Sequence, residues 1–156
     1  MAIPQTIDLT NTTPAAPTGR QNVQWQGDAG TPRNVSANIP LPLYTITWGI
    51  AIGTPATTGT DVTPHYLVPF SGKPLAVTIC GKLAPVGADL IVDLLQNGTS
   101  ILAAPLHLVA GATTGSSTSF ASGTLTAGAL MTLNCTQIGT TVPGQDVTIQ
   151  LTVQSS

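Results

Sequence analysis

The stretch DVTIQLTVQ (residues 146–154) indicates the fold class of this chain, because its side chains alternate strictly between polar and apolar. Val147, Ile149, Leu151 and Val153 occupy one set of alternate positions, and Asp, Thr and Gln occupy the other. Successive side chains of an extended strand point to opposite faces. The alternation therefore predicts a β-strand that buries one face and leaves the other in water.

The same period of two recurs upstream, most clearly in YTITWGIAI (residues 44–52). There the large residues alternate with small or polar ones, which predicts a strand that buries Tyr44, Ile46, Trp48, Ile50 and Ile52. Residues 88–96 fit a helix or a strand. The Asn97-Gly98 pair that follows is a strong hairpin signal and favours the strand.

Further strands are expected between turn signals along the rest of the chain. The expected core-facing sets are Tyr66, Val68 and Phe70; Leu75, Val77 and Ile79; and Met131, Leu133 and Cys135. Shorter strands are expected at residues 99–103 and 106–109, and a loop with one short strand at 111–123. The total is about eight strands.

Composition supports an all-β protein. The 156 residues include 26 Thr, 16 Gly and 13 Pro, but only four Lys or Arg and six Asp. Few residues are therefore suited to a solvated helix face. We expect an antiparallel two-sheet β-sandwich over residues 41–156, with jelly-roll topology. An immunoglobulin-like sandwich is the alternative, but its Cys-Trp-Cys order is missing because Trp48 precedes both cysteines.

Residues 1–40 have a different pattern, rich in Pro and Thr, and predict an extended N-terminal arm. Short extended pieces are expected at residues 6–9 and 22–26. Fully stretched, such an arm spans roughly 130 Å. We expect it to dock on a partner, with the following residues in contact: Ile3, Ile7, Leu9, Val23, Trp25 and Arg33.

Charge and hydropathy exclude several classes of partner. A net charge of −2 with scattered cations does not suit binding to nucleic acid. The mean hydropathy of +0.31 reflects uncharged polar residues. The longest uncharged apolar stretch, residues 41–52, is too short to span a membrane, so no membrane insertion is expected. A surface so poor in charge favours assembly with other proteins, and a solvated β-domain is the alternative.

The beginning of the sequence has neither a basic segment nor an apolar core of the kind found in signal peptides. We therefore expect synthesis in a cytoplasm. In that reducing compartment Cys80 and Cys135 are expected to be free thiols.

Candidate catalytic groups are few. His65 and His107 are interpreted as ordinary strand residues. Asp89 and Asp93 would share a strand face roughly 13 Å apart, too far to act as a carboxylate pair. No spacing typical of a zinc, nucleotide or serine-hydrolase site occurs. The sequence therefore predicts no catalytic residue, no cofactor and no metal site.

Two further groups of side chains are better explained by structure than by binding. Asp61 and Asp146 lie beside turns, where an Asp stabilises the local backbone. Tyr44, Trp48 and Tyr66 fall on expected core faces, so they do not form a platform for sugar stacking.

Parts of the chain resemble a known group of proteins. Residues 7–40 resemble an N-terminal segment of structural proteins from tailed bacteriophages and prophages, chiefly in TTPAAP (12–17), NVQWQ (22–26) and PRNVS (32–36). PFSG (69–72), LLQNGTSIL (94–102) and IG with PGQDVT (138–139 and 143–148) are similar to jelly-roll modules at phage fibre tips and on capsid exteriors.

The resemblance implies a virion location, a β-sandwich and no catalytic residues. We therefore expect a non-enzymatic structural protein, most simply a capsid decoration protein that docks through its arm. Its partners would be the major capsid or tail protein and further copies of itself, with a homotrimer favoured. One alternative is a tail-fibre or tail-tip protein that recognises the host, with a surface glycan as ligand. Another is a free carbohydrate-binding module.

Overall fold

The computed structural model describes residues 20–26, 32–38 and 41–156, with side chains from residue 41 onward. The chain divides into two compact units, Met1–Pro42 and Leu43–Ser156, which we describe separately. The boundary predicted from composition lies after residue 40.

The described part of the first unit is a β-hairpin. Strand β1 (Arg20–Gln26) pairs antiparallel with β2 (Pro32–Asn38). The sequence predicted an extended piece at residues 22–26, which β1 contains, but not its partner β2. The extended piece expected at residues 6–9 lies outside the described residues.

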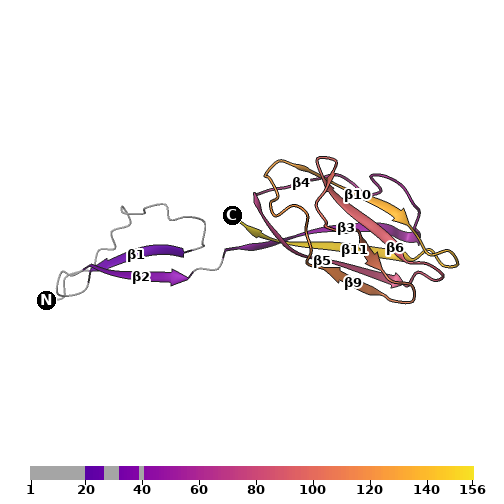
Figure 1. The fold of residues 1–156 in the computed structure, drawn as a ribbon, viewed down its shortest axis with the longest axis horizontal. Coiled ribbons are helices and arrows are strands. Elements are labelled where there is room, and N and C mark those ends of the chain that lie inside the picture. The colour runs from indigo at the N-terminus through magenta and orange to yellow at the C-terminus, as the bar shows by residue number, and fades with distance from the viewer. Residues whose placement is uncertain (1–19, 27–31, 39–40) are drawn as a thin grey trace. The chain divides into compact units, whose positions relative to one another are not determined.

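The second unit is a sandwich of two antiparallel sheets (Figure 1). One sheet has the order β3 (Leu43–Pro55), β11 (Gln145–Ser155), β5 (Gly72–Leu83), β9 (Thr114–Ser117). The other has the order β4 (Tyr66–Leu67), β10 (Leu130–Gln137), β6 (Leu90–Gln96), β7 (Thr99–Ser100), and β8 (Leu106–Leu108) also pairs with β6.

This strand order is that of a jelly roll. Strands β7 and β8 pair in turn with the same neighbour, β6, and together fill one position. Numbering the eight positions along the chain gives the orders 1-8-3-6 and 2-7-4-5 in the two sheets, so the chain crosses repeatedly between them. Two interlocked Greek keys produce this pattern. The predicted all-β sandwich is confirmed.

The core lies between the sheets and is built from the predicted alternate positions. Ile46, Trp48 and Ile50 of β3 are buried, as are all four apolar residues of the 146–154 stretch. On the opposite sheet the buried set includes Leu90, Val92, Leu94, Met131, Leu133 and Cys135. Central strand β11 therefore contributes its whole inner face, which explains why its sequence alternates so strictly.

Ile52 was predicted to face the core, and this prediction was wrong. Its side chain is 68% exposed. Ala51 has φ 54°, and the pairing of β3 with β11 shifts register between Val147 and Gln145. A β-bulge of this kind changes which face the following residues occupy.

Three other strand predictions need correction. Leu75 was expected inside with Val77 and Ile79, but it is only partly buried, because the pairing of β5 with β11 shifts register between Thr152 and Val153 and places Pro74 inward. Phe70 was expected inside with Tyr66 and Val68, but it is 64% exposed because β4 ends at Leu67 and the chain bends at Pro69. The strand expected at residues 99–103 stops at Ser100.

The two ends of the sandwich carry different segments. Leu43 begins β3 opposite Gln154, and Ser156 N–H donates to the carbonyl of Ser71, so the first unit joins the sandwich at the end that carries the C-terminus. At the opposite end the segments at residues 84–89, 109–113 and 138–144 contact one another. Gly111 N–H donates to the carbonyl of Pro85 at 2.7 Å, and Val86 bridges to Val142.

Candidate functional site

The predicted docking residues fall into two groups. Ile3, Ile7 and Leu9 lie outside the described residues. Val23, Trp25 and Arg33 belong to the β1–β2 hairpin, where Trp25 is the register partner of Arg33 and Val23 is the partner of Val35. The hairpin thus brings together three positions that the sequence placed along a single extended segment. Their role in docking stays a prediction.

Both histidines are paired with aspartates. His107 Nδ1 lies 3.0 Å from Asp89 Oδ2, and His65 contacts Asp61 through Nε2. Asp89 Oδ1 also accepts from the Ala110 N–H at 2.9 Å. The His107 hydrogen bond first, and the Ala110 hydrogen bond second, hold the pKa of the Asp89 carboxyl below its ordinary value of 3.8. Asp89 and His107 are 18 positions apart in the sequence, which hid this pair from sequence reasoning.

The lowered pKa of Asp89 predicts a pH dependence of stability. The folded state binds this proton less tightly than the unfolded state, so the ionised carboxylate stabilises the fold above about pH 4. The contribution is lost as the pH falls below that value. We expect Asp89→Asn to lower the urea midpoint at about pH 6 and to have little effect at about pH 2.

The control for that experiment is His107→Ala, which removes the largest cause of the shift while retaining the carboxylate. It should reproduce most of the loss at about pH 6, and the double variant should lose little more than either single one. Equal effects of Asp89→Asn at both pH values would contradict the prediction.

Asp93 and Asp146 accept hydrogen bonds from a neighbouring side chain and from the backbone, respectively. Asp93 Oδ1 accepts from the Ser100 hydroxyl at 2.6 Å, so Asp89 and Asp93 have different partners. Asp146 Oδ1 accepts from the Gly53 N–H across the β3 bulge, and Asp146 itself has φ 50°. Within residues 20–26, 32–38 and 41–156, no group of three or more His, Cys or acidic side chains could hold a metal ion.

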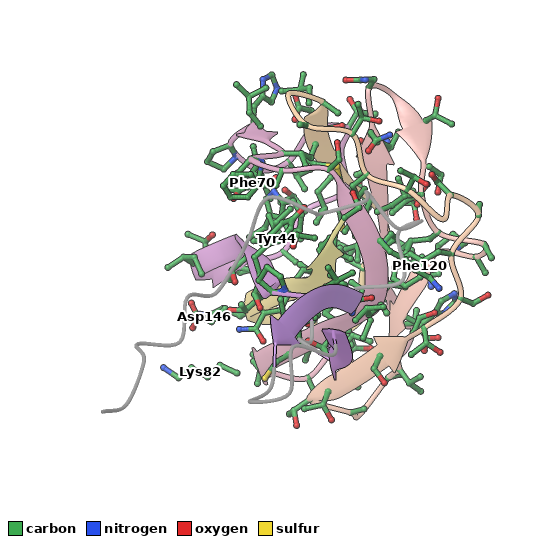
Figure 2. All side chains as sticks on the ribbon, turned by 90° about the vertical axis from the view of Figure 1, so that its left-hand side faces the viewer. Tyr44, Phe70, Lys82, Phe120 and Asp146 are labelled. Carbon is green, nitrogen blue, oxygen red and sulfur yellow. The ribbon has the colours of Figure 1, made fainter. Side chains whose placement is uncertain are left out.

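Tyr44, Trp48 and Tyr66 turn toward the core, as expected. Trp48 is only 4% exposed, and its ring lies 6.1 Å from that of Tyr66 at a steep angle. Tyr44 is partly buried and packs edge-on against Phe70. The two side chains lie close together in Figure 2. A sugar-binding platform needs exposed ring faces, and these three core-facing rings do not supply one.

Cys80 and Cys135 are free thiols, which confirms that prediction. They belong to different sheets, on β5 and β10. Burial raises the pKa of the Cys135 thiol, whereas Cys80 is exposed. In the part of the chain that is described, no helix is long and apolar enough to cross a membrane.

The outer side of the β3-β11-β5-β9 sheet is an uncharged surface, which we call the threonine face. It is made of the side chains that alternate with the buried ones along each strand. Thr47 and Thr78 both lie opposite Gln150 in the register, and Thr78 lies opposite Ser116. The face comprises Thr45, Thr47, Gly49, Ala76, Thr78, Cys80, Thr114, Ser116, Thr148, Gln150 and Thr152.

Charges occur only toward the ends of this face. Lys73 and Lys82 lie near the two ends of β5, and Asp146 lies near the start of β11. Lys82 and Asp146 both extend from the same side of the sandwich in Figure 2. Charged groups are costly to desolvate, and the cores of protein interfaces are depleted of them. The threonine face is therefore suited to contact with protein.

A second surface lies at the loop end, away from the attachment of the first unit. Leu83, Val86 and Val109 are 48%, 42% and 55% exposed there. The Gly111–Pro85 hydrogen bond and the Val86–Val142 bridge hold the loops that carry them. These three exposed apolar side chains make the loop end a second candidate contact surface.

The chain was compared with known proteins at three levels. No family model, no curated protein and no solved structure matches it.

Proposed function

We propose that this chain is a non-enzymatic structural protein on the exterior of a phage virion, and that it decorates the capsid. The observation that carries the proposal is the threonine face, a four-stranded sheet surface that bears charge only near its ends. A separate N-terminal unit, joined to one end of the sandwich, suits attachment to the particle. The resemblance of residues 7–40 to phage structural proteins supports the same role.

Attachment is assigned to the first unit, with Trp25 as its main anchor. Truncating a buried aromatic anchor at an interface costs about 2 kcal/mol or more. We therefore expect Trp25→Ala to bind particles that lack the protein about thirtyfold more weakly than the unaltered chain does. Binding is measured by co-sedimentation with the particles, followed by quantification of the bound chain.

The matched control is Val109→Ser, which alters the loop end and leaves the first unit intact. It should bind the particle normally. Cryo-electron microscopy of intact particles then locates the protein: density on the capsid shell supports decoration, and absence from the particle excludes a virion role.

The second candidate function is host recognition at the tail tip. The exposed apolar cluster of Leu83, Val86 and Val109 favours it, because this cluster lies at the end away from the attachment of the first unit. In that case density appears only at the tail tip, and Val109→Ser reduces adsorption to host cells whereas Trp25→Ala reduces incorporation into the particle.

A further inference from the structure

Strand β3 leaves a long open edge on the sandwich. It is the terminal strand of its sheet and pairs only with β11. Among the described residues, no other backbone hydrogen bond involves residues 43–50. Every second residue of an antiparallel edge strand turns its N–H and C=O groups away from its neighbour. This edge therefore offers a row of free donors and acceptors.

The other edges of the sandwich are short. Strand β9, at the opposite edge of the same sheet, has four residues, and β4 and β7 have two each. Proteins protect edge strands by keeping them short or by placing lysine, proline or a bulge in them. In β3 the bulge at Ala51 and the Asp146–Gly53 hydrogen bond protect only the far part. Residues 43–50 contain no charge and no proline.

We propose that residues 44–50 of β3 pair antiparallel with the same residues of a second copy of this chain, around a two-fold axis that passes between the two Thr47 residues. The pairing joins two four-stranded sheets into one continuous sheet of eight strands. It adds about eight main-chain hydrogen bonds between the copies. This inference deepens the proposed assembly role by naming the surface through which copies meet.

The register of such a pair is restricted by the core. Tyr44, Ile46, Trp48 and Ile50 turn inward, so only outer positions can lie opposite outer positions. Thr45, Thr47 and Gly49 of one copy therefore face the same set in the other. Thr–Thr pairs are favourable across strands, and no like charges meet.

A second copy fits this edge better than an unrelated strand. It supplies an edge of equal length with the same free groups and the same lack of charge. The pairing also has a consequence for attachment. The two Leu43 residues, where the first units join, would lie just beyond opposite ends of the paired segment, about 27 Å apart. A dimer of this form presents two attachment points.

Stacking of two threonine faces is the competing arrangement, and Thr47 and Thr78 distinguish it from edge pairing. Both threonines are exposed and both lie opposite Gln150, but Thr47 is on edge strand β3 and Thr78 is on inner strand β5. In an edge pair, Thr47→Lys places two like charges opposite each other across the two-fold axis. Thr78→Lys places its charge on β5, two strands away from the paired edge.

The full-length chain is examined by sedimentation equilibrium, and thermal melting verifies that each variant folds. We expect the unaltered chain to form a dimer of twice 15.8 kDa. Thr47→Lys should weaken the dimer about fivefold to tenfold, and Thr78→Lys should change its dissociation constant less than about twofold. An equimolar mixture of Thr47→Lys and Thr47→Asp should restore dimers, because opposite charges then face each other.

Hydrogen exchange gives a second readout. Amides of residues 43–50 should become more protected as the protein concentration rises, and Thr47→Lys should abolish that change. A monomer at all concentrations would overturn the inference, as would the trimer predicted from the sequence. Equal disruption by Thr47→Lys and Thr78→Lys would indicate face stacking instead. A monomer that still decorates particles would refute the edge pairing and leave the proposed function intact.

Discussion

Replacement of Leu151 by alanine is expected to lower the free energy of unfolding by about 2–5 kcal/mol. Leu151 is fully buried on β11, the strand between β3 and β5. Its register partners are Ile46 on one side and Val77 on the other, and both are fully buried. Alanine removes most of the side chain, and neighbours held in two sheet ladders cannot close the space.

The measurement is equilibrium unfolding in urea, with the midpoint and the slope fitted separately. Leu67→Ala is the matched control, since Leu67 is also a strand leucine but is 63% exposed. It should change stability by about 0.5 kcal/mol or less. A loss at Leu151 no larger than that at Leu67 would mean that the space between the sheets is not tightly packed.

Much of the sandwich could be predicted from local alternation. A strand that buries one face must place apolar residues at every second position, and β11, β10 and the first part of β3 do so. The features that escaped prediction depend on backbone conformation at single residues. Ala51 adopts a left-handed backbone conformation, which is uncommon for alanine and could not be predicted from the sequence. This conformation turns Ile52 outward.

The candidate surfaces required knowledge of which strands are neighbours. The sequence shows threonines at alternate positions of residues 44–52 and 146–154, but not that these strands lie side by side. The same limit applies to His107 and Asp89, which meet only because β8 pairs with the start of β6. Local patterns predict which face a residue occupies, and tertiary pairing decides what it lies beside.

The open edge of β3 illustrates the same point. Residues 43–50 would be unremarkable in an inner strand, where an uncharged, β-branched sequence is usual. At the end of a sheet the same residues form an edge without the usual protection. Only the strand order of the sheet shows that residues 43–50 form an edge strand and not an inner one. The sequence alone therefore could not have suggested the comparison of Thr47 with Thr78.

Gly139→Ala is expected to destabilise the fold by about 3 kcal/mol or more. Gly139 lies in the segment between β10 and β11, at the loop end of the sandwich. A Cβ atom there would overlap the carbonyl oxygen of Val142 and lie 2.8 Å from the backbone nitrogen of Val86. Both obstacles are backbone atoms joined by the Val86–Val142 bridge, so neither can move without breaking that contact.

Gly123→Ala is the matched control for this variant. An added Cβ at Gly123 meets no atom within 4 Å, and its φ is not in the left-handed range. Alanine there restricts mainly the unfolded chain and should leave stability unchanged or raise it by up to about 1 kcal/mol. Both variants are compared in urea with the unaltered chain. If the two glycines tolerate alanine equally, the loops at residues 84–89 and 138–144 are not held together by close backbone contact. The exposed side chains of Val86 and Val109 would then not be held in fixed positions by those loops.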